Sequence, residues 1–305
     1  MPAVIAAVAV IALTVTVAGP VLIAAANGDT VVNMLDCIKK LIQQIRERAP
    51  GMPKPPPGRS KKDMKKAAQE LGLKYKYYNF GFCGPQGAGK SSLINSLRDL
   101  PNVEKTQDWN HDIFNAAPTG ETETTTRLNQ YGWRKDDEAP RYLRLWDIPG
   151  CGTIGNRIQN YFNDNHLYVF DCLLMITQGI LGEYELRILN EAGACNTPIV
   201  IVLSKSELKA ESKARCRYDR KDMSATEYQP IVEDTINEAK QHMLDTINKA
   251  QASYKSIKIS RVFVVSAVKF RDFLKTHTET DALLAFETSE LLSYLVAEAK
   301  NKRVA

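Results

Sequence analysis

Short apolar runs alternate with amphipathic stretches in the part of the chain that follows Tyr77. The runs have the length and β-branched content of buried strands, and polar turns bound them. They occupy residues 77–83, 125–133, 142–147, 169–176, 197–204 and 261–267. From Glu227 to Ala252, apolar residues recur every three to four positions, as on one face of a helix. This alternation predicts an α/β fold with a mostly parallel sheet and helices on both faces.

The amino-terminal end has a different pattern, because Met1 to Gly28 contains no charged side chain. Residues 3–26 are long enough, at about 1.5 Å per residue, to cross a hydrocarbon core of roughly 30 Å. We expect a spanning or deeply inserted membrane segment within residues 1–32. The alternatives are a re-entrant hairpin broken at Gly19-Pro20, a buried core helix and a cleaved signal peptide, although no positive residue precedes Lys39.

The next segment, residues 33–59, is basic and then rich in proline. Asn33 to Ala49 predicts a short amphipathic helix that either lies on an anionic membrane surface or packs on the following domain. Five prolines between Pro50 and Pro57 indicate a stiff polyproline spacer. At about 3.1 Å per residue, positions 49–60 would then reach roughly 37 Å.

The following domain is expected to begin at Ser60, which can cap a basic helix that ends at Gly72. We assign residues 60–288 to this domain. A carboxyl-terminal helix and tail over residues 289–305 follow it.

Charge is distributed unevenly along the 305 residues, which are 44% hydrophobic and carry a formal net charge of +5. This composition excludes a disordered chain or a collagen-like fibre. Residues 33–76 carry 12 Lys/Arg and 4 Asp/Glu, a net of +8, whereas residues 77–305 carry 28 and 30, a net of −2. Because the basic excess follows the apolar segment, the rest of the chain is expected in the cytosol. We expect no nucleic-acid partner, since the excess is local and lacks interleaved aromatic residues.

The most specific local motif is GPQGAGKS, residues 84–91, a complete G-x-x-x-x-G-K-[ST]. It follows a predicted strand and precedes the helical stretch SSLINSLRDL, which is the order that a phosphate-binding loop requires. Backbone amides and the helix dipole would face phosphate, Lys90 would reach its outer groups, and Ser91 would offer a hydroxyl to Mg²⁺. The residues expected to hold a nucleotide here are Gly84, Gln86, Gly87, Ala88, Gly89, Lys90, Ser91 and Ser92. The alternative is a glycine-rich turn without a ligand.

A second motif is expected to hold the metal and to contact the terminal phosphate. LWDIPG ends an apolar strand with D-x-x-G, which places Asp147 near Mg²⁺ and the Gly150 amide against the γ-phosphate. Between the two motifs lies the polar run TGETETTT, residues 119–126, which suits a switch that orders around the γ-phosphate and the metal. A solvated loop is the alternative for this run.

Base recognition is expected from the sequence SKSE, at the place where the usual guanine-reading element is [NT]-K-x-D. Ser204 keeps a hydroxyl, Lys205 can stack its stem along the base, and Glu207 keeps a carboxylate one methylene further from the backbone. If the backbone does not compensate, a charge-assisted hydrogen bond worth about 1.5 to 3 kcal/mol is weakened. Ser266 and Ala267, after the last apolar run, would offer backbone amides to the base.

In this order, the motifs resemble those of the immunity-related, interferon-inducible GTPases, a dynamin-related family with an IRG-type G domain. The resemblance covers about residues 68–288 and rests on GPQGAGKSS, AAPTGETETTT, LWDIPGCGT, YFNDNHLYVFDCLLMIT and RVFVVSAVKFRDF. It implies a Ras-like P-loop NTPase fold that binds GTP and GDP with Mg²⁺ and hydrolyses GTP slowly. It also implies activation by nucleotide-dependent self-association, often on membranes, with the family's carboxyl-terminal helical domain missing or reduced here.

The resemblance further implies Thr125 as the threonine for γ-phosphate and Mg²⁺, with Thr124 as a close rival. Cys151 stands where Ras-type enzymes carry a water-orienting glutamine, so we consider Glu123 as the group that orients the attacking water. The expected catalytic residues are therefore Lys90, Glu123, Thr125 and Gly150, and the expected metal-binding residues are Ser91, Thr125 and Asp147.

Three functions fit these observations. The favoured one is a membrane-anchored GTPase that hydrolyses GTP to GDP and phosphate and forms homo-oligomers. The second is a membrane-tethered nucleotide-binding scaffold with little or no hydrolysis. The third is an ATPase or kinase that uses the same phosphate-binding loop.

Overall fold

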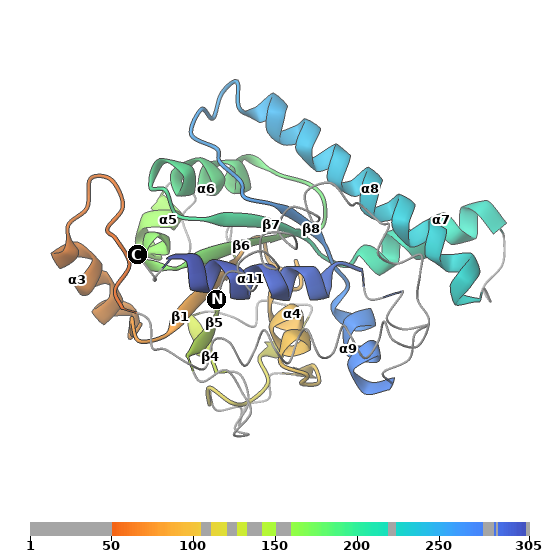
Figure 1. Ribbon diagram of the computed structural model, residues 1–305, viewed down its shortest axis with the longest axis horizontal. Helices are drawn as coiled ribbons and strands as arrows, with labels where there is room; N and C mark the ends of the chain where they lie inside the picture. The colour runs from red at the N-terminus through yellow and green to blue at the C-terminus, as the bar shows by residue number, and fades with distance from the viewer. Residues whose placement is uncertain are drawn as a thin grey trace, which may run out of the picture.

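The computed structural model describes residues 51–104, 111–120, 127–132, 142–150, 160–218, 224–276, 284 and 286–302. Its centre is a six-stranded sheet of order β4-β5-β1-β6-β7-β8, in which all neighbours are parallel except β4 and β5 (Figure 1). The strands are β1 (Tyr78–Cys83), β4 (Asn129–Tyr131), β5 (Leu143–Asp147), β6 (Cys172–Thr177), β7 (Ile199–Leu203) and β8 (Val262–Val264). A separate parallel pair joins β2 (Val103–Glu104) to β3 (Pro118–Thr119). The predicted α/β fold with a mostly parallel sheet is confirmed.

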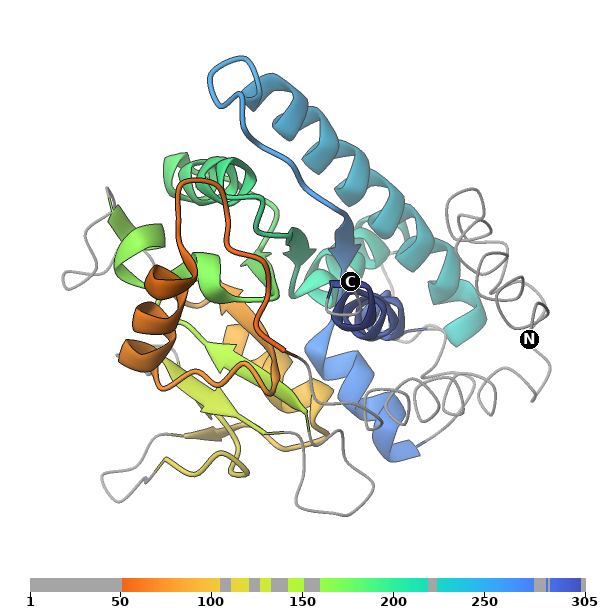
Figure 2. The ribbon, with the colours of Figure 1, turned by 60° about the vertical axis from the view of Figure 1, so that its left-hand side comes forward.

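Helices cover both faces of the sheet, because side chains alternate in direction along each strand. In β6, Leu173 and Met175 pack into one apolar cluster, and Cys172, Leu174 and Ile176 pack into the other. The first face carries α3 (Lys61–Leu71), α5 (Tyr161–Asp164), the 3-10 helix η2 (Leu167–Val169), α6 (Glu183–Ala194), α7 (Ser206–Tyr218) and α8 (Ala225–Ala250). The second face carries α4 (Lys90–Leu97), α9 (Ala267–Thr276) and α11 (Thr288–Lys302), which lies beside β8 (Figure 2).

The apolar runs locate the strands, but strand ends differ from the prediction at β4, which begins at Asn129, and at β6 and β8. The run 169–176 predicts one strand, yet β6 begins at Cys172 because residues 167–169 form a buried 3-10 turn. Burial makes both segments apolar, so an apolar run does not separate a strand from a tight buried turn. The last strand likewise ends at Val264, and α9 already begins at Ala267.

The helix at the start of the domain follows its local signals. The Ser60 hydroxyl accepts from the Asp63 amide at 3.2 Å, and the Asp63 carboxylate accepts from the Ser60 amide at 2.7 Å, which forms a capping box. The helix α3 ends at Gly72, whose φ of 68° is in the left-handed region. Met64, Ala67 and Ala68 form its buried face.

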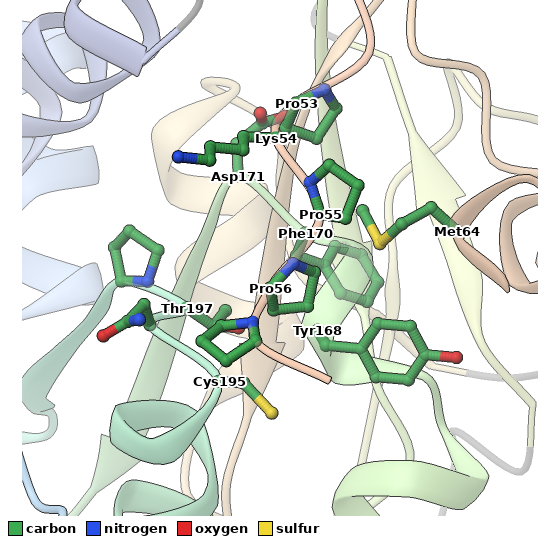
Figure 3. A pocket seen from close by; sticks show the side chains of 13 residues that line it. Pro53, Lys54, Pro55, Pro56, Met64, Tyr168, Phe170, Asp171, Cys195 and Thr197 are labelled. Carbon is green, nitrogen blue, oxygen red and sulfur yellow. The ribbon is translucent and has the colours of Figure 1, made fainter. Parts of the chain in front are cut away.

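The proline-rich strap, residues 51–59, packs against the domain. Pro56 is buried, and the Arg59 guanidinium lies 3.8 Å from the centroid of the Tyr168 ring. Arg59 also donates from Nη2 to Oδ1 of Asn163 at 2.7 Å. The strap covers the beginnings of β6 and β7 and encloses a cavity of about 430 Å³ (Figure 3), which is lined by Pro53, Lys54, Pro55, Pro56, Pro57, Met64, Tyr168, Phe170, Asp171, Cys195, Asn196, Thr197 and Pro198.

An extended spacer of roughly 37 Å is therefore wrong for the described part of this linker. A polyproline segment has no internal hydrogen bonds to lose when it bends onto a surface. Burial of Pro56 and the contact between Arg59 and Tyr168 stabilise the docked strap.

The two ends of the chain differ in what the structure describes. Residues 3–26 and 33–49, which carry the membrane and amphipathic-helix predictions, lie outside the described residues. Within the described ranges, no helix is both long and apolar enough to cross a membrane. At the other end, α11 buries Leu291, Leu292 and Leu295 in the second apolar cluster, so this helix shares the core of the sheet. The boundary between residues 60–288 and 289–305 stays a prediction.

Candidate nucleotide site

The phosphate-binding loop joins the end of β1 to the start of α4, in the middle of the sheet. Gly84 has a φ of 134°, and a Cβ at this position would lie 2.1 Å from the carbonyl oxygen of Ile176. Only glycine fits there, so the backbone can pass close beneath a ligand. Gly87 and Gly89 also have positive φ values, of 72° and 91°. The loop amides and the amino end of α4 together form an anion-binding concavity.

Lys90 and Gln86 take different positions around this loop. The Lys90 side chain is buried, and its ammonium donates to the carbonyl oxygens of Gly84 at 3.2 Å and Pro85 at 2.9 Å. Gln86 is exposed on the outside of the loop. The Lys90 charge is thus held within the loop itself, where the amides of the loop also converge.

The predicted metal-binding pair is in contact. The Ser91 hydroxyl donates to Oδ2 of Asp147 at 2.5 Å, and Asp147 has no exposed surface. The parallel pairing of β1 with β5, which sets Asp147 opposite Phe82, brings the carboxylate to the loop. A hydroxyl and a carboxylate are the oxygen donors that Mg²⁺ prefers, so the residues present fit this ion. Thr125 and Glu123 lie outside the described residues.

Gly150 packs directly on the phosphate-binding loop. A Cβ on Gly150 would lie 2.9 Å from the backbone nitrogen of Gln86. The backbone after Asp147 therefore reaches the loop only because residue 150 has no side chain. This places the Gly150 amide at the phosphate end of the site. Ser92, one position beyond Ser91, accepts a hydrogen bond from Asn102 at 3.4 Å instead of facing the loop.

Ser204 contacts the phosphate-binding loop and not open space. Its hydroxyl, which is buried, lies 2.5 Å from the carbonyl oxygen of Ala88 and 3.2 Å from that of Thr177. The sequence predicts that this hydroxyl contacts a base directly. It instead forms a hydrogen bond that links the end of β7 to the phosphate-binding loop. The hydroxyl is already committed to these carbonyls, so its effect on a base would act through the position of the loop.

The other base-contacting residues surround the same end of the sheet. Lys205 has a φ of 55°, a left-handed conformation that turns the chain into α7. Glu207, in the first turn of α7, is 8% exposed, and its Oε2 has no hydrogen-bond partner among the described residues. A buried carboxylate oxygen needs a donor, because burying a charge without one is costly. The N–H groups of a guanine base supply such donors.

Ser266 and Ala267 lie next to this segment. The Ser206 amide donates to the carbonyl oxygen of Val265 at 3.3 Å, which joins the start of α7 to the end of β8. The Ser266 hydroxyl accepts from the Lys269 amide at 3.1 Å, and Ala267 begins α9. The structure therefore brings together both predicted base-contacting segments, although they are far apart in the sequence.

Two buried polar residues, Asn95 in α4 and Arg98 at its carboxyl-terminal cap, were missed by motif reasoning. Asn95 donates to the carbonyl oxygen of Ala117 at 2.8 Å and accepts from the Ala117 amide at 2.7 Å. Arg98, with no exposed surface, donates to three backbone carbonyls, those of Gly132 at 2.7 Å, Asn115 at 2.8 Å and Ile113 at 3.1 Å. Burial lowers the pKa of Arg98 to about 10, which leaves it charged at neutral pH. One signal was present, because Arg98 follows Ile94 by four residues and so lies on the apolar side of the helix.

A third missed residue contacts the loop from β6. Gln178 follows the last residue of that strand, and its side-chain amide donates to the carbonyl oxygen of Gly87 at 3.0 Å. A single glutamine after an apolar strand has no sequence signature, so only the fold identifies this contact.

Comparison with known proteins agrees with this geometry. The family model for interferon-inducible GTPases matches residues 76–273, which is more than half of the chain. T-cell-specific guanine nucleotide triphosphate-binding protein 2 of Mus musculus is 28% identical over 165 residues, which cover 53% of this chain and 36% of that protein. Interferon-inducible GTPase 5 of Bos taurus is 32% identical over 111 residues, which cover 36% of this chain and 21% of that protein. The match thus spans well under half the length of these relatives.

Solved structures with a related arrangement are more distant. A GTP-binding protein from Sulfolobus solfataricus in complex with GDP covers 92% of this chain and 70% of its own, with 14% identity and a TM-score of 0.37. That score is too low to transfer any detail of a site. The family match, in contrast, includes the phosphate-binding loop, Asp147 and both base-contacting segments in one continuous range. This chain therefore belongs to the interferon-inducible GTPase family.

Proposed function

We propose that this chain binds GTP and GDP with Mg²⁺ and hydrolyses GTP to GDP and phosphate. The observation that carries the proposal is the contact between Ser91 and Asp147 at 2.5 Å, beside a loop that only glycine at position 84 allows. Ser91, with Asp147 behind it and Thr125 from the switch segment, would hold Mg²⁺. When bound, the ion would neutralise negative charge on the β- and γ-phosphates.

The chain's own residues would stabilise the charge that develops as water attacks the γ-phosphorus and the bond to the β-phosphate oxygen breaks. Lys90, whose ammonium lies within the loop, and the loop amides would face that charge, and the Gly150 amide would face the γ-phosphate. Glu123 would orient the water or accept its proton, because residue 151 is Cys and lacks an amide for this role. Turnover of Glu123→Ala, with GTP binding intact, tests this role. Unchanged turnover at high protein concentration would remove Glu123 from the mechanism.

Guanine preference is supported by Glu207, whose buried oxygen requires a donor. Competition of GTP, GDP and ATP for the purified full chain, in detergent or vesicles, tests both this preference and nucleotide binding itself. Tight preference for ATP would favour the ATPase or kinase and overturn the assignment of Glu207. Binding of GTP without measurable turnover would favour the nucleotide-binding scaffold.

Homo-oligomer formation at the nucleotide-bearing edge of the sheet is supported by three exposed apolar side chains. Ile180, in the loop after β6, is 81% exposed, and Leu208, in the first turn of α7, is 57% exposed. Val268, in the first turn of α9, is 41% exposed. Such residues around one site are typical of an interface. Association of two copies there would couple hydrolysis to protein concentration.

Turnover per chain, measured against protein concentration, tests this association. We expect the rate to rise with concentration in the unmodified protein and to stay flat in Ile180→Asp/Leu208→Asp. Leu244→Asp is the matched control, because Leu244 is also exposed but lies on α8, away from the nucleotide. A concentration-independent rate in the unmodified chain would argue against activation by self-association.

The membrane location is proposed on the apolar residues 3–26, which contain no charge, and on the basic residues that follow them. The domain would then lie in the cytosol. Retention of the full chain in the membrane fraction at high salt and at alkaline pH tests the anchor. Release under both conditions would exclude it.

A further inference from the structure

One face of α3 carries a dense row of positive charge. Lys61, Lys62, Lys65 and Lys66 are all exposed, and we call them the α3 basic face. At 3.6 residues per turn they fall within an arc of about 140°, and the buried Met64, Ala67 and Ala68 all lie outside this arc. The packing of α3 on the domain therefore sorts all four charges to the outside.

The surroundings of this face add to the positive charge. Residues 51–76 carry eight Lys/Arg and two Asp/Glu, a net of +6, whereas the chain as a whole carries +5. The two acidic residues are both engaged, Asp63 with the Ser60 cap and Glu70 with His166 at 2.7 Å. Within the described residues, Lys66 is the one member of the face in a salt bridge, with Glu70 at 3.9 Å, although Lys62 also lies near Asp63. An isolated exposed pair of this kind neutralises little of the field.

The docked strap determines where the preceding chain meets the domain. Pro53 to Pro57 and Met64 of α3 line the same cavity, so the strap runs along the side of the domain that carries α3 (Figure 3). The amino-terminal 50 residues, including the uncharged stretch 3–26, therefore connect to the domain through the strap, which lies at the beginnings of β6 and β7 on the side that carries α3.

The candidate nucleotide site lies at the carboxyl ends of the parallel strands, away from α3. The chain enters β1 after α3 and reaches the phosphate-binding loop after the six residues of that strand. At about 3.3 Å per residue, this places the loop about 20 Å from the start of β1, which the chain enters after α3. In Figure 1, α3 lies at one end of the molecule and α7 and α9 lie at the other.

We propose that the α3 basic face rests on the anionic headgroups of the membrane that holds the amino-terminal segment. This inference rests on the proposed anchoring. Each lysine near an anionic surface raises the affinity of the protein for that surface about five-fold. Anchoring through the strap, on the side of the domain that carries α3, keeps the four lysines close to the lipid. The domain is then oriented with its nucleotide site and the exposed Ile180 and Leu208 pointing away from the bilayer, open to a second copy.

The test is lysine acylation of the full chain in vesicles, with each lysine followed by mass spectrometry. The vesicles contain phosphatidylcholine alone or with phosphatidylserine. We expect the α3 lysines to react at least about five-fold more slowly on the anionic vesicles. Lys249 and Lys275, exposed on α8 and α9, are internal controls and should not change. Molar salt should restore the rates, because it shortens the screening length to about 3 Å.

Two charge variants sharpen the test. In Lys62→Gln/Lys65→Gln/Lys66→Gln, the remaining Lys61 should lose its protection on anionic vesicles. The matched control, Arg215→Gln/Lys249→Gln/Lys275→Gln, removes three charges elsewhere on the domain. In this variant Lys61 should stay protected from acylation on anionic vesicles. Equal acylation rates on neutral and anionic vesicles, with the chain retained in both, would overturn the inference.

Two further outcomes separate this inference from other readings. If the chain does not stay with vesicles of either composition, the proposed anchoring itself fails. If RNA without lipid protects the α3 lysines as well as anionic vesicles do, the face binds polyanions in general and the membrane assignment is wrong.

Discussion

Removal of the Arg98 side-chain charge tests how α4 holds the segments on either side of residues 120–126. The guanidinium is fully buried and donates to the backbone carbonyls of Ile113, Asn115 and Gly132. It also lies 5.2 Å from the centroid of the Tyr131 ring. The substitution Arg98→Met keeps an unbranched apolar stem but removes the guanidinium and with it all three hydrogen-bond donors.

The cost follows from the three carbonyls. A hydrogen bond to a charged group contributes about 1.5 to 3 kcal/mol, and a buried acceptor left without a donor adds its desolvation. Asn115 is exposed and Ile113 half-buried, so water can partly replace the donor there, whereas Gly132 is buried. The hydrogen bond to Gly132 is lost in full, and those to Asn115 and Ile113 are partly replaced by water. We therefore expect Arg98→Met to lower the free energy of unfolding by about 3 kcal/mol. Arg98→Lys keeps the charge but loses the planar set of guanidinium donors, so we expect it to lower the free energy of unfolding by about 2 kcal/mol.

Urea unfolding of the full chain in detergent, without nucleotide, measures this loss. The control is Arg217→Met, because Arg217 is an exposed arginine paired with Asp234 at 2.7 Å. We expect the control to lose less than about 1 kcal/mol, as surface pairs do. A loss below about 1 kcal/mol for Arg98→Met would refute the reasoning, since one buried and two part-buried charge-assisted hydrogen bonds are expected to contribute more than that.

Three further predictions concern the nucleotide site. Gly84→Ala should destabilise the nucleotide-free protein by more than about 3 kcal/mol in thermal unfolding, because its Cβ would meet Ile176, whereas Gly87→Ala, with open space around it, should cost about 1 kcal/mol. Glu207→Gln should weaken GTP binding by about ten-fold or more and leave ATP binding unchanged, as competition titration would reveal; equal loss for both nucleotides would contradict base recognition. Ser91→Ala should lower GTP affinity in Mg²⁺ but match the unmodified protein in chelator, and a deficit that persists in chelator would place Ser91 outside metal binding.

Local patterns were enough for the elements whose conformation depends on near neighbours in the chain. The capping box of Ser60 and Asp63 and the left-handed Gly72 set both ends of α3 as expected, because each involves residues within one turn of the helix. The phosphate-binding loop is local in the same way, since its glycines determine where backbone amides can point. The strands were located by their apolar runs, because both faces of a parallel sheet are buried.

Contacts between distant segments set the rest. Ser204 reaches Ala88 across 116 positions, and Arg98 reaches Gly132 across 34, so no window of sequence contains both partners. The composition of the proline-rich strap predicts an extended polyproline segment. The contact that holds it instead, between Arg59 and the ring of Tyr168 at 3.8 Å, joins residues that only the folded domain brings together. Composition and spacing thus predict the phosphate-binding loop and the positions of the strands along the chain. Packing decides which polar groups hydrogen-bond to the phosphate-binding loop, which face of α3 points outward and where the linker lies. The free energy of these contacts comes from surfaces that exist only after the chain has folded.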